Sequence, residues 1–122
     1  MEYDFVYIER RTYLHVIGSG THSIDNINRF FADTNRVRTE KQFDSVLIEM
    51  RFVGPSLHFG GIYSIIVDNL RDASLVKRIA YVDTVAEHLV DRTEFAALAG
   101  RKLGLRGGVF RTVDEAQAWL GE

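Results

Sequence analysis

The stretch SVLIEMRFVGPSLHFGG, residues 45–61, decides the fold of this chain. It begins with a short apolar run, Val46, Leu47 and Ile48, which is typical of a strand buried on both faces of a sheet. The turn residues of VGPSLHFGG follow directly. Beyond the turn, apolar residues recur at the spacing of a helix face: Phe59, Ile62, Tyr63, Ile66 and Leu70. A central strand that leads through a turn into a helix indicates an α/β protein.

The residues before this stretch predict a hairpin and a helix. Residues 3–10 and 13–19 are rich in β-branched and aromatic side chains, and the short gap between them leaves room only for a tight connection. We expect the glycines at 18 and 20 to end the second strand. Ser23 then precedes apolar residues at helical spacing and is suited to cap a helix. The polar run at 33–44 predicts the solvated end of that helix and a loop.

The residues after the stretch continue the alternation of strands and helices. A strand is expected at 77–82, a helix at 95–103 and a short strand at 108–111. Thr112 and Glu115 then form a capping box, which predicts a final helix. Residues 1–122 are therefore expected to form a single α/β domain. Its sheet would be mixed, mostly parallel and five-stranded, with an N-terminal antiparallel hairpin and about four helices.

The composition excludes several classes of function. The 15 basic and 17 acidic residues leave a net charge of −2, so no general field attracts nucleic acid. The chain has no cysteine, and no segment approaches the roughly 18 consecutive apolar residues of a membrane span. We therefore expect a cytoplasmic protein that has no membrane span and binds no nucleic acid.

No catalytic or metal site is predicted. Ser56 and His58 are two apart at a helix start, where neighbouring side chains normally point to different sides. No nucleophile elbow and no phosphate-binding glycine motif is present. The histidines lie in separate segments without metal-ligand spacing and are expected to be solvated or locally bonded: His15, His22, His58 and His88. We therefore predict no enzyme activity and no cofactor, and we interpret Ser56 first as a helix cap.

Two clusters of side chains remain. One is basic but interleaved with acidic residues, which favours a solvated surface: Arg29, Arg36, Arg38 and Lys41. The other is apolar and exceeds what one helix stripe needs: Phe30, Phe31, Phe52, Leu57, Phe59, Tyr63 and residues 65–67. Core packing is the favoured explanation for the apolar cluster. A dimer contact and a pocket between helices and sheet are the alternatives.

The chain resembles the SpoIIAA-like branch of the STAS fold in three features: its element order, the strand VLIEM followed by Ser56 at a helix start, and the closing VFRTVDEAQAWL. That branch is related to bacterial anti-sigma-factor antagonists and shares its architecture with SEC14-type lipid carriers. The resemblance implies a serine turn that is phosphorylated by a partner kinase, which also serves as the anti-sigma factor. Of the family's Asp-Ser-Ser-Gly-like pattern, this chain keeps only the serine, Ser56, between Pro55 and Leu57.

The sequence therefore predicts a bacterial, non-enzymatic STAS-like domain that acts in regulation or protein interaction. Its partner would be another protein or a second copy of the chain. The candidate binding residues are Ser56, His58, Phe59 and Tyr63, and Ser56 is also the candidate phosphorylation site. The alternative function is a carrier or sensor of a small apolar or lipid-like ligand, held under the helix at 59–70.

Overall fold

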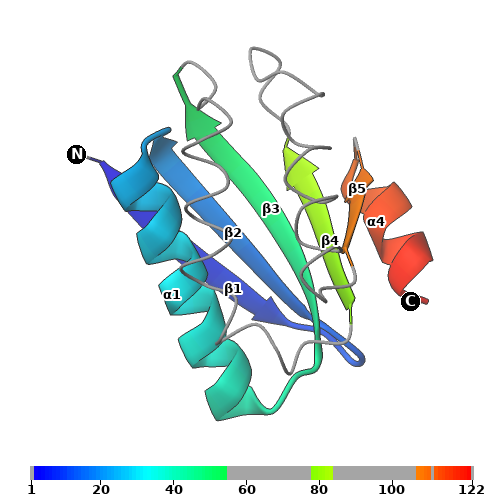
Figure 1. Cartoon of the computed structure of the whole chain (residues 1–122). Helices are drawn as coiled ribbons and strands as arrows, with labels where there is room; N and C mark the ends of the chain where they lie inside the picture. The colour runs from blue at the N-terminus through cyan, green and yellow to red at the C-terminus, as the bar shows by residue number, and fades with distance from the viewer. Residues whose placement is uncertain (1, 55–77, 84–106, 111, 122) are drawn as a thin grey trace.

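The computed structural model describes residues 2–54, 78–83, 107–110 and 112–121 (Figure 1). The elements in chain order are β1 (Tyr3–Glu9), β2 (Leu14–Thr21), α1 (Ile24–Lys41), β3 (Ser45–Val53), β4 (Arg78–Asp83), β5 (Gly107–Phe110) and α4 (Val113–Leu120). The strands form one sheet in the order β1-β2-β3-β4-β5. Strand β1 is antiparallel to β2, and each later pair of neighbours is parallel. The α/β class and the mixed sheet with an antiparallel first pair are confirmed.

Strands β1 and β2 form the predicted hairpin, but β2 is longer than expected. It continues through its glycines to Thr21, so the prediction that they end the strand was wrong. Gly18 is needed inside the strand because two rings pack against its backbone. A Cβ atom at Gly18 would lie 2.8 Å from Phe30 Cδ1 and 2.8 Å from Phe52 Cζ. The glycine therefore makes room for core rings.

Helix α1 begins at the predicted cap. The Ser23 hydroxyl accepts a hydrogen bond from the Asn26 backbone N–H at 3.2 Å. The buried Asn26 amide group, in turn, donates to the carbonyl oxygens of Glu2 and Thr21, both at 2.8 Å. One side chain thus joins the start of α1 to the chain just before β1 and to the end of β2.

The polar run at 33–44 proves to be mostly helical. Helix α1 extends to Lys41, and Gln42 ends it in the left-handed conformation with φ 61°. Thr34, Val37 and Arg38 are buried, because they continue the core-facing stripe of the helix. The interpretation of Arg38 as part of a solvated basic cluster was therefore wrong. Its guanidinium donates to the Phe43 carbonyl at 3.4 Å.

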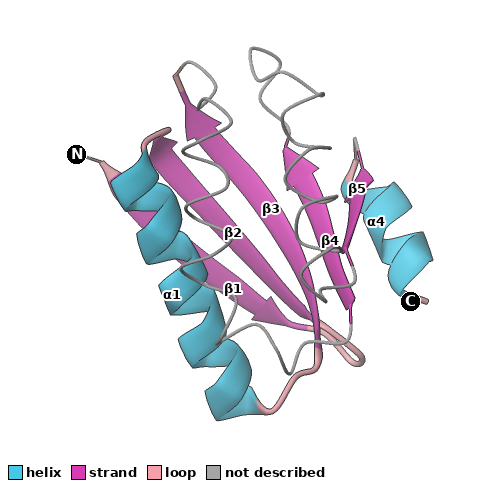
Figure 2. Ribbon diagram, in the orientation of Figure 1, coloured by secondary structure: helices cyan, strands magenta, loops and turns pink. Residues whose placement is uncertain are grey.

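Strand β3 is central and buried on both faces, as predicted, and its two faces contact different helices (Figure 2). Val46, Ile48 and Phe52 face α1 and pack with Phe30. Phe30 and Phe52 are fully buried, so core packing accounts for these two members of the apolar cluster. Leu47 points to the opposite face, where it joins the cluster that includes residues of β4 and α4. Helices α1 and α4 therefore lie on opposite faces of the sheet.

Helix α4 also begins where the sequence predicts. The Thr112 hydroxyl accepts a hydrogen bond from the Glu115 N–H at 3.2 Å. The Glu115 carboxylate accepts from the same hydroxyl at 3.3 Å. The Gln117 amide group donates to the Tyr13 hydroxyl at 2.9 Å and so joins α4 to the residue preceding β2. The helices expected at 59–70 and 95–103 lie outside the described residues.

Candidate functional site

Strand β1 carries the most exposed run of apolar side chains among the described residues. It is the terminal strand of the sheet, and no strand within the described part of the chain pairs with its outer edge. Three consecutive residues remain accessible to solvent: Val6 is 54% exposed, Tyr7 40% and Ile8 37%. Val6 and Ile8 lie on the sheet face opposite α1, whereas Tyr7 lies on the α1 face, because side chains alternate along a strand. We call these three residues the β1 surface.

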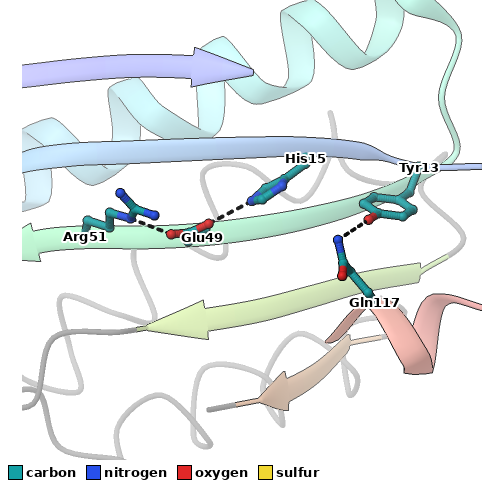
Figure 3. Close-up of polar contacts among 5 residues, drawn as sticks. All are labelled: Tyr13, His15, Glu49, Arg51 and Gln117. Carbon is teal, nitrogen blue, oxygen red and sulfur yellow. Dashed lines mark hydrogen bonds and ion pairs between the residues drawn. The ribbon is translucent and has the colours of Figure 1, made fainter. Parts of the chain in front are cut away.

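A chain of polar side chains, buried at one end, lies on β2 and β3, on the sheet face opposite α1 (Figure 3). His15 Nε2 of β2 lies 2.8 Å from Glu49 Oε1 of β3. The Arg51 Nε–H donates to the other carboxylate oxygen, Glu49 Oε2. His15 and Glu49 are only 5% and 2% exposed, whereas the side chain of Arg51 is 57% exposed. These three side chains therefore connect the interior of the protein to solvent.

Physical chemistry explains why these three residues belong together. A carboxylate buried in an apolar strand is stable only if donors satisfy both of its oxygens. Each oxygen of Glu49 has one partner, His15 on one side and Arg51 on the other. The His15 Nδ1 atom is buried and has no hydrogen-bond partner within the described residues. The expectation that His15 is solvated or locally bonded was wrong, since its partner lies 34 residues away.

An open pocket of about 560 Å³ lies where Arg51 reaches solvent. It is at the carboxyl ends of β2 and β3, the edge at which open α/β sheets usually bind ligands. Its lining residues are Glu2, Tyr3, Asp4, Ser19, Gly20, Arg51 and Val53. The lining contains two carboxylates, one guanidinium and one serine hydroxyl. A pocket of this kind suits a small polar group better than an apolar chain.

Tyr3, at the rim of this pocket, is held by its own contacts. Its hydroxyl donates to Asp33 Oδ2 of α1 at 2.7 Å, and the Arg29 guanidinium carbon lies 4.8 Å from its ring centroid. Burial, followed by the hydrogen bond to Asp33, raises the pKa of the Tyr3 hydroxyl well above its usual value. The hydroxyl is therefore a neutral donor at physiological pH and has no role as a base.

The described residues do not assemble a catalytic constellation around the buried pair. Ser19 is on the same face of β2 as His15, but it lies four residues further along the strand, about 13 Å away. That distance is far beyond hydrogen-bond reach. No group of three His, Asp or Glu side chains within the described residues could hold a metal ion. The geometry supports binding and structural roles for these side chains.

The site residues predicted from the sequence are not among these groups. Ser56, His58, Phe59 and Tyr63 lie outside the described residues, so their placement stays a prediction. Sequence reasoning missed the His15–Glu49 pair and the exposure of β1. Neither helix in the described part of the chain is long and apolar enough to cross a membrane. No protein-family model matches the chain, and no curated protein matches it either.

Proposed function

We propose that this chain is a non-enzymatic, STAS-like domain that acts through protein interaction, and that β1 provides its contact surface. The strand order supports the STAS-like part of the proposal. An antiparallel first pair is followed by parallel neighbours in chain order, as the resemblance of the element order implies. The proposed cytoplasmic, regulatory role in a bacterium rests on that resemblance.

The exposure of the β1 surface carries the proposal of an interaction domain. Val6, Tyr7 and Ile8 are consecutive, apolar and each more than a third exposed. They lie on a seven-residue edge strand whose sequence, YDFVYIE, contains neither proline nor lysine. Proteins usually protect such edges with those residues, or by covering the edge. The strand does carry two acidic residues, Asp4 and Glu9, but no described strand covers its outer edge. An apolar edge of this kind is suited to receive a partner strand.

The polar chain supports a binding domain over an enzyme. Glu49 neutralises Arg51 and orients its guanidinium at the pocket, while the nearest serine on the same strand face is out of reach of His15. We assign His15 and Glu49 a structural role in the sheet. Of these three residues, Arg51 is the one that reaches solvent, so a polar group of a partner can contact it.

Two earlier predictions extend this proposal to residues outside the described part of the chain. Ser56 is proposed as a site at which phosphorylation regulates partner binding, since negative charge is favourable at a helix start. The alternative function, a carrier of an apolar ligand, was predicted for a cavity under residues 59–70. The pocket in the described residues does not favour that alternative, because its lining is mainly polar.

Site-specific photo-crosslinking in cells of the protein's own host tests the contact surface. A photoreactive phenylalanine analogue is placed at Val6, and as a control at Ala32, which is exposed on α1. We expect a discrete covalent adduct from position 6 and none from position 32. Ile8→Lys should remove the adduct, because it places a charge beside Val6 in the contact.

Two outcomes of the crosslinking experiment would overturn the proposal. Equal labelling from positions 6 and 32, or an adduct at position 6 that survives Ile8→Lys in a folded protein, would show that β1 is not a specific contact surface. Circular dichroism of the Ile8→Lys variant checks that the fold is kept. The side chain of Ile8 is 37% exposed, so we expect the substitution to be tolerated.

A further inference from the structure

We propose that the partner of β1 is β1 of a second copy of this chain, paired antiparallel about a twofold axis at Tyr7. This inference rests on the proposed function, since it names the partner of the same surface. The two five-stranded sheets would then join into one continuous sheet. The backbone of β1, its side chains and the position of α1 all support this pairing.

At alternate residues, the backbone of β1 offers donors and acceptors that no described strand pairs with. The Arg10 N–H donates to the Tyr13 carbonyl at 3.0 Å, and the Thr21 N–H donates to the Glu2 carbonyl at 3.1 Å. Even-numbered residues of this hairpin therefore direct their backbone groups toward β2. Odd-numbered residues direct theirs outward. Tyr7 is the odd residue within the β1 surface, and a twofold axis there makes its N–H and C=O a reciprocal hydrogen-bonded pair with its own copy.

The side chains match when the axis passes through Tyr7. In that register, Val6 lies opposite Ile8 of the second copy, and Asp4 lies opposite Arg10 of the second copy. Both pairs are on the face opposite α1, and both are non-hydrogen-bonded pairs, in which side chains come closest. Each pair occurs twice because of the symmetry. On this face, the register joins apolar residues with apolar residues and opposite charges with each other. On the α1 face, Phe5 lies opposite Glu9 of the second copy, and the Glu9 carboxylate has the ammonium group of Lys41 in its own chain 3.9 Å away.

Neighbouring registers lack this complementarity. An axis at Val6 would place Asp4 opposite Ile8, and an axis at Phe5 would place Asp4 opposite Val6. Each would bring two carboxylates against aliphatic side chains. An axis at Ile8 would place Val6 opposite Arg10. On the face opposite α1, the sequence of β1 therefore favours the axis at Tyr7 over its neighbours.

Helix α1 leaves room for this arrangement. It packs over β2 and β1 on one face of the sheet. Strands lie about 4.8 Å apart, so a helix centred between β1 and β2 is about 5 Å from the axis along the sheet. The two copies of α1 would then be about 10 Å apart, the separation of packed helices. By this estimate, α1 is compatible with the proposed pairing of β1.

The mass of the full chain in solution, measured by sedimentation and light scattering, tests the inference. We expect a particle of twice the 13.9 kDa chain mass. Asp4→Arg and Arg10→Asp each create two like-charge pairs and should weaken association about tenfold or more. The double variant Asp4→Arg/Arg10→Asp restores opposite charges and should restore the dimer. Asp114→Arg makes the same change of charge on α4 and should leave the mass unchanged.

Hydrogen exchange adds a readout at the backbone. The Tyr7 amide should exchange slowly in the dimer and fast in the Asp4→Arg variant. A 13.9 kDa particle at the highest soluble concentration would overturn the inference. So would a dimer whose mass is insensitive to both single variants, or a double variant that fails to recover. If the chain is monomeric but position 6 crosslinks specifically to a different protein, the interaction function stands and only the self-pairing fails.

Discussion

Replacing both members of the buried His15–Glu49 pair should cost less stability than replacing either one. The pair joins side chains that are 5% and 2% exposed across 2.8 Å. Glu49→Leu leaves both ring nitrogens of His15 without a partner within the described residues. His15→Leu leaves one carboxylate oxygen of Glu49 unpaired while Arg51 holds the other. A buried unsatisfied polar group costs about 1–3 kcal/mol, and more if it is charged. We therefore expect each single variant to lose about 2–3 kcal/mol.

The double variant, His15→Leu/Glu49→Leu, removes both polar groups together. Arg51 then turns into water, since 57% of its side chain is already exposed. Replacing a buried ion pair by apolar residues is often neutral or stabilising. The double variant should therefore lose less stability than either single variant. This corresponds to a coupling energy of about 2 kcal/mol, within the range found for residues in contact.

Urea denaturation of the four proteins in this cycle measures the coupling directly. A matched control is the exposed pair Arg36 and Glu40 of α1, whose side chains are 56% and 59% exposed and 3.9 Å apart. Its alanine cycle should give less than about 0.5 kcal/mol. Single variants of the buried pair that cost under about 1 kcal/mol each, and whose costs simply add in the double variant, would show that His15 and Glu49 are not coupled.

Three further predictions concern the core and its caps. Gly18→Ala should cost about 1–3 kcal/mol in urea denaturation, because its methyl group would overlap two buried rings; an unchanged midpoint would contradict the packing. Asn26→Asp should destabilise the protein by more than about 2 kcal/mol in the same assay, since a carboxylate would face two carbonyl oxygens. If Asn26→Ser costs as much, the loss would not come from the negative charge of the aspartate. Because the folded state raises the pKa of Tyr3, the contribution of this hydroxyl to the free energy of unfolding is fully present below pH 10 and is lost as the pH rises above it. Tyr3→Phe should reduce this alkaline loss of stability. A variant with the same dependence of stability on pH as the wild type would contradict the prediction.

The sequence predicts elements best where local signals act alone. Ser23 and the apolar spacing after it placed the start of α1, and the run at Val46–Ile48 placed β3. The prediction that the run at 33–44 contains the end of α1 and a loop is confirmed, but the burial of this end was missed because its polar residues hide a core-facing stripe. Arg38 is buried within that stripe, and composition cannot distinguish a buried arginine from a solvated one. The glycines of β2 were misjudged because their reason is two aromatic rings from distant segments.

The polar chain shows what a sequence signal can and cannot give. A glutamate inside the buried run VLIEM signals that Glu49 needs a partner. The sequence does not identify His15 as the partner of Glu49, because the residue that faces Glu49 depends on the register between β2 and β3. Tertiary packing decides that register. The exposure of β1 likewise depends on the strand order, since an edge strand and a central strand can share the same apolar composition.

The two hydrogen bonds of Asn26 also bear on how readily β1 can be recognised. They anchor the residue before β1 and the end of β2 to the first turn of α1, so the edge strand is fixed at its beginning as well as along its inner side. A strand that is already ordered loses little conformational entropy when a partner pairs with it. We expect that loosening this anchor would weaken the proposed association through β1, without altering any residue of the proposed contact.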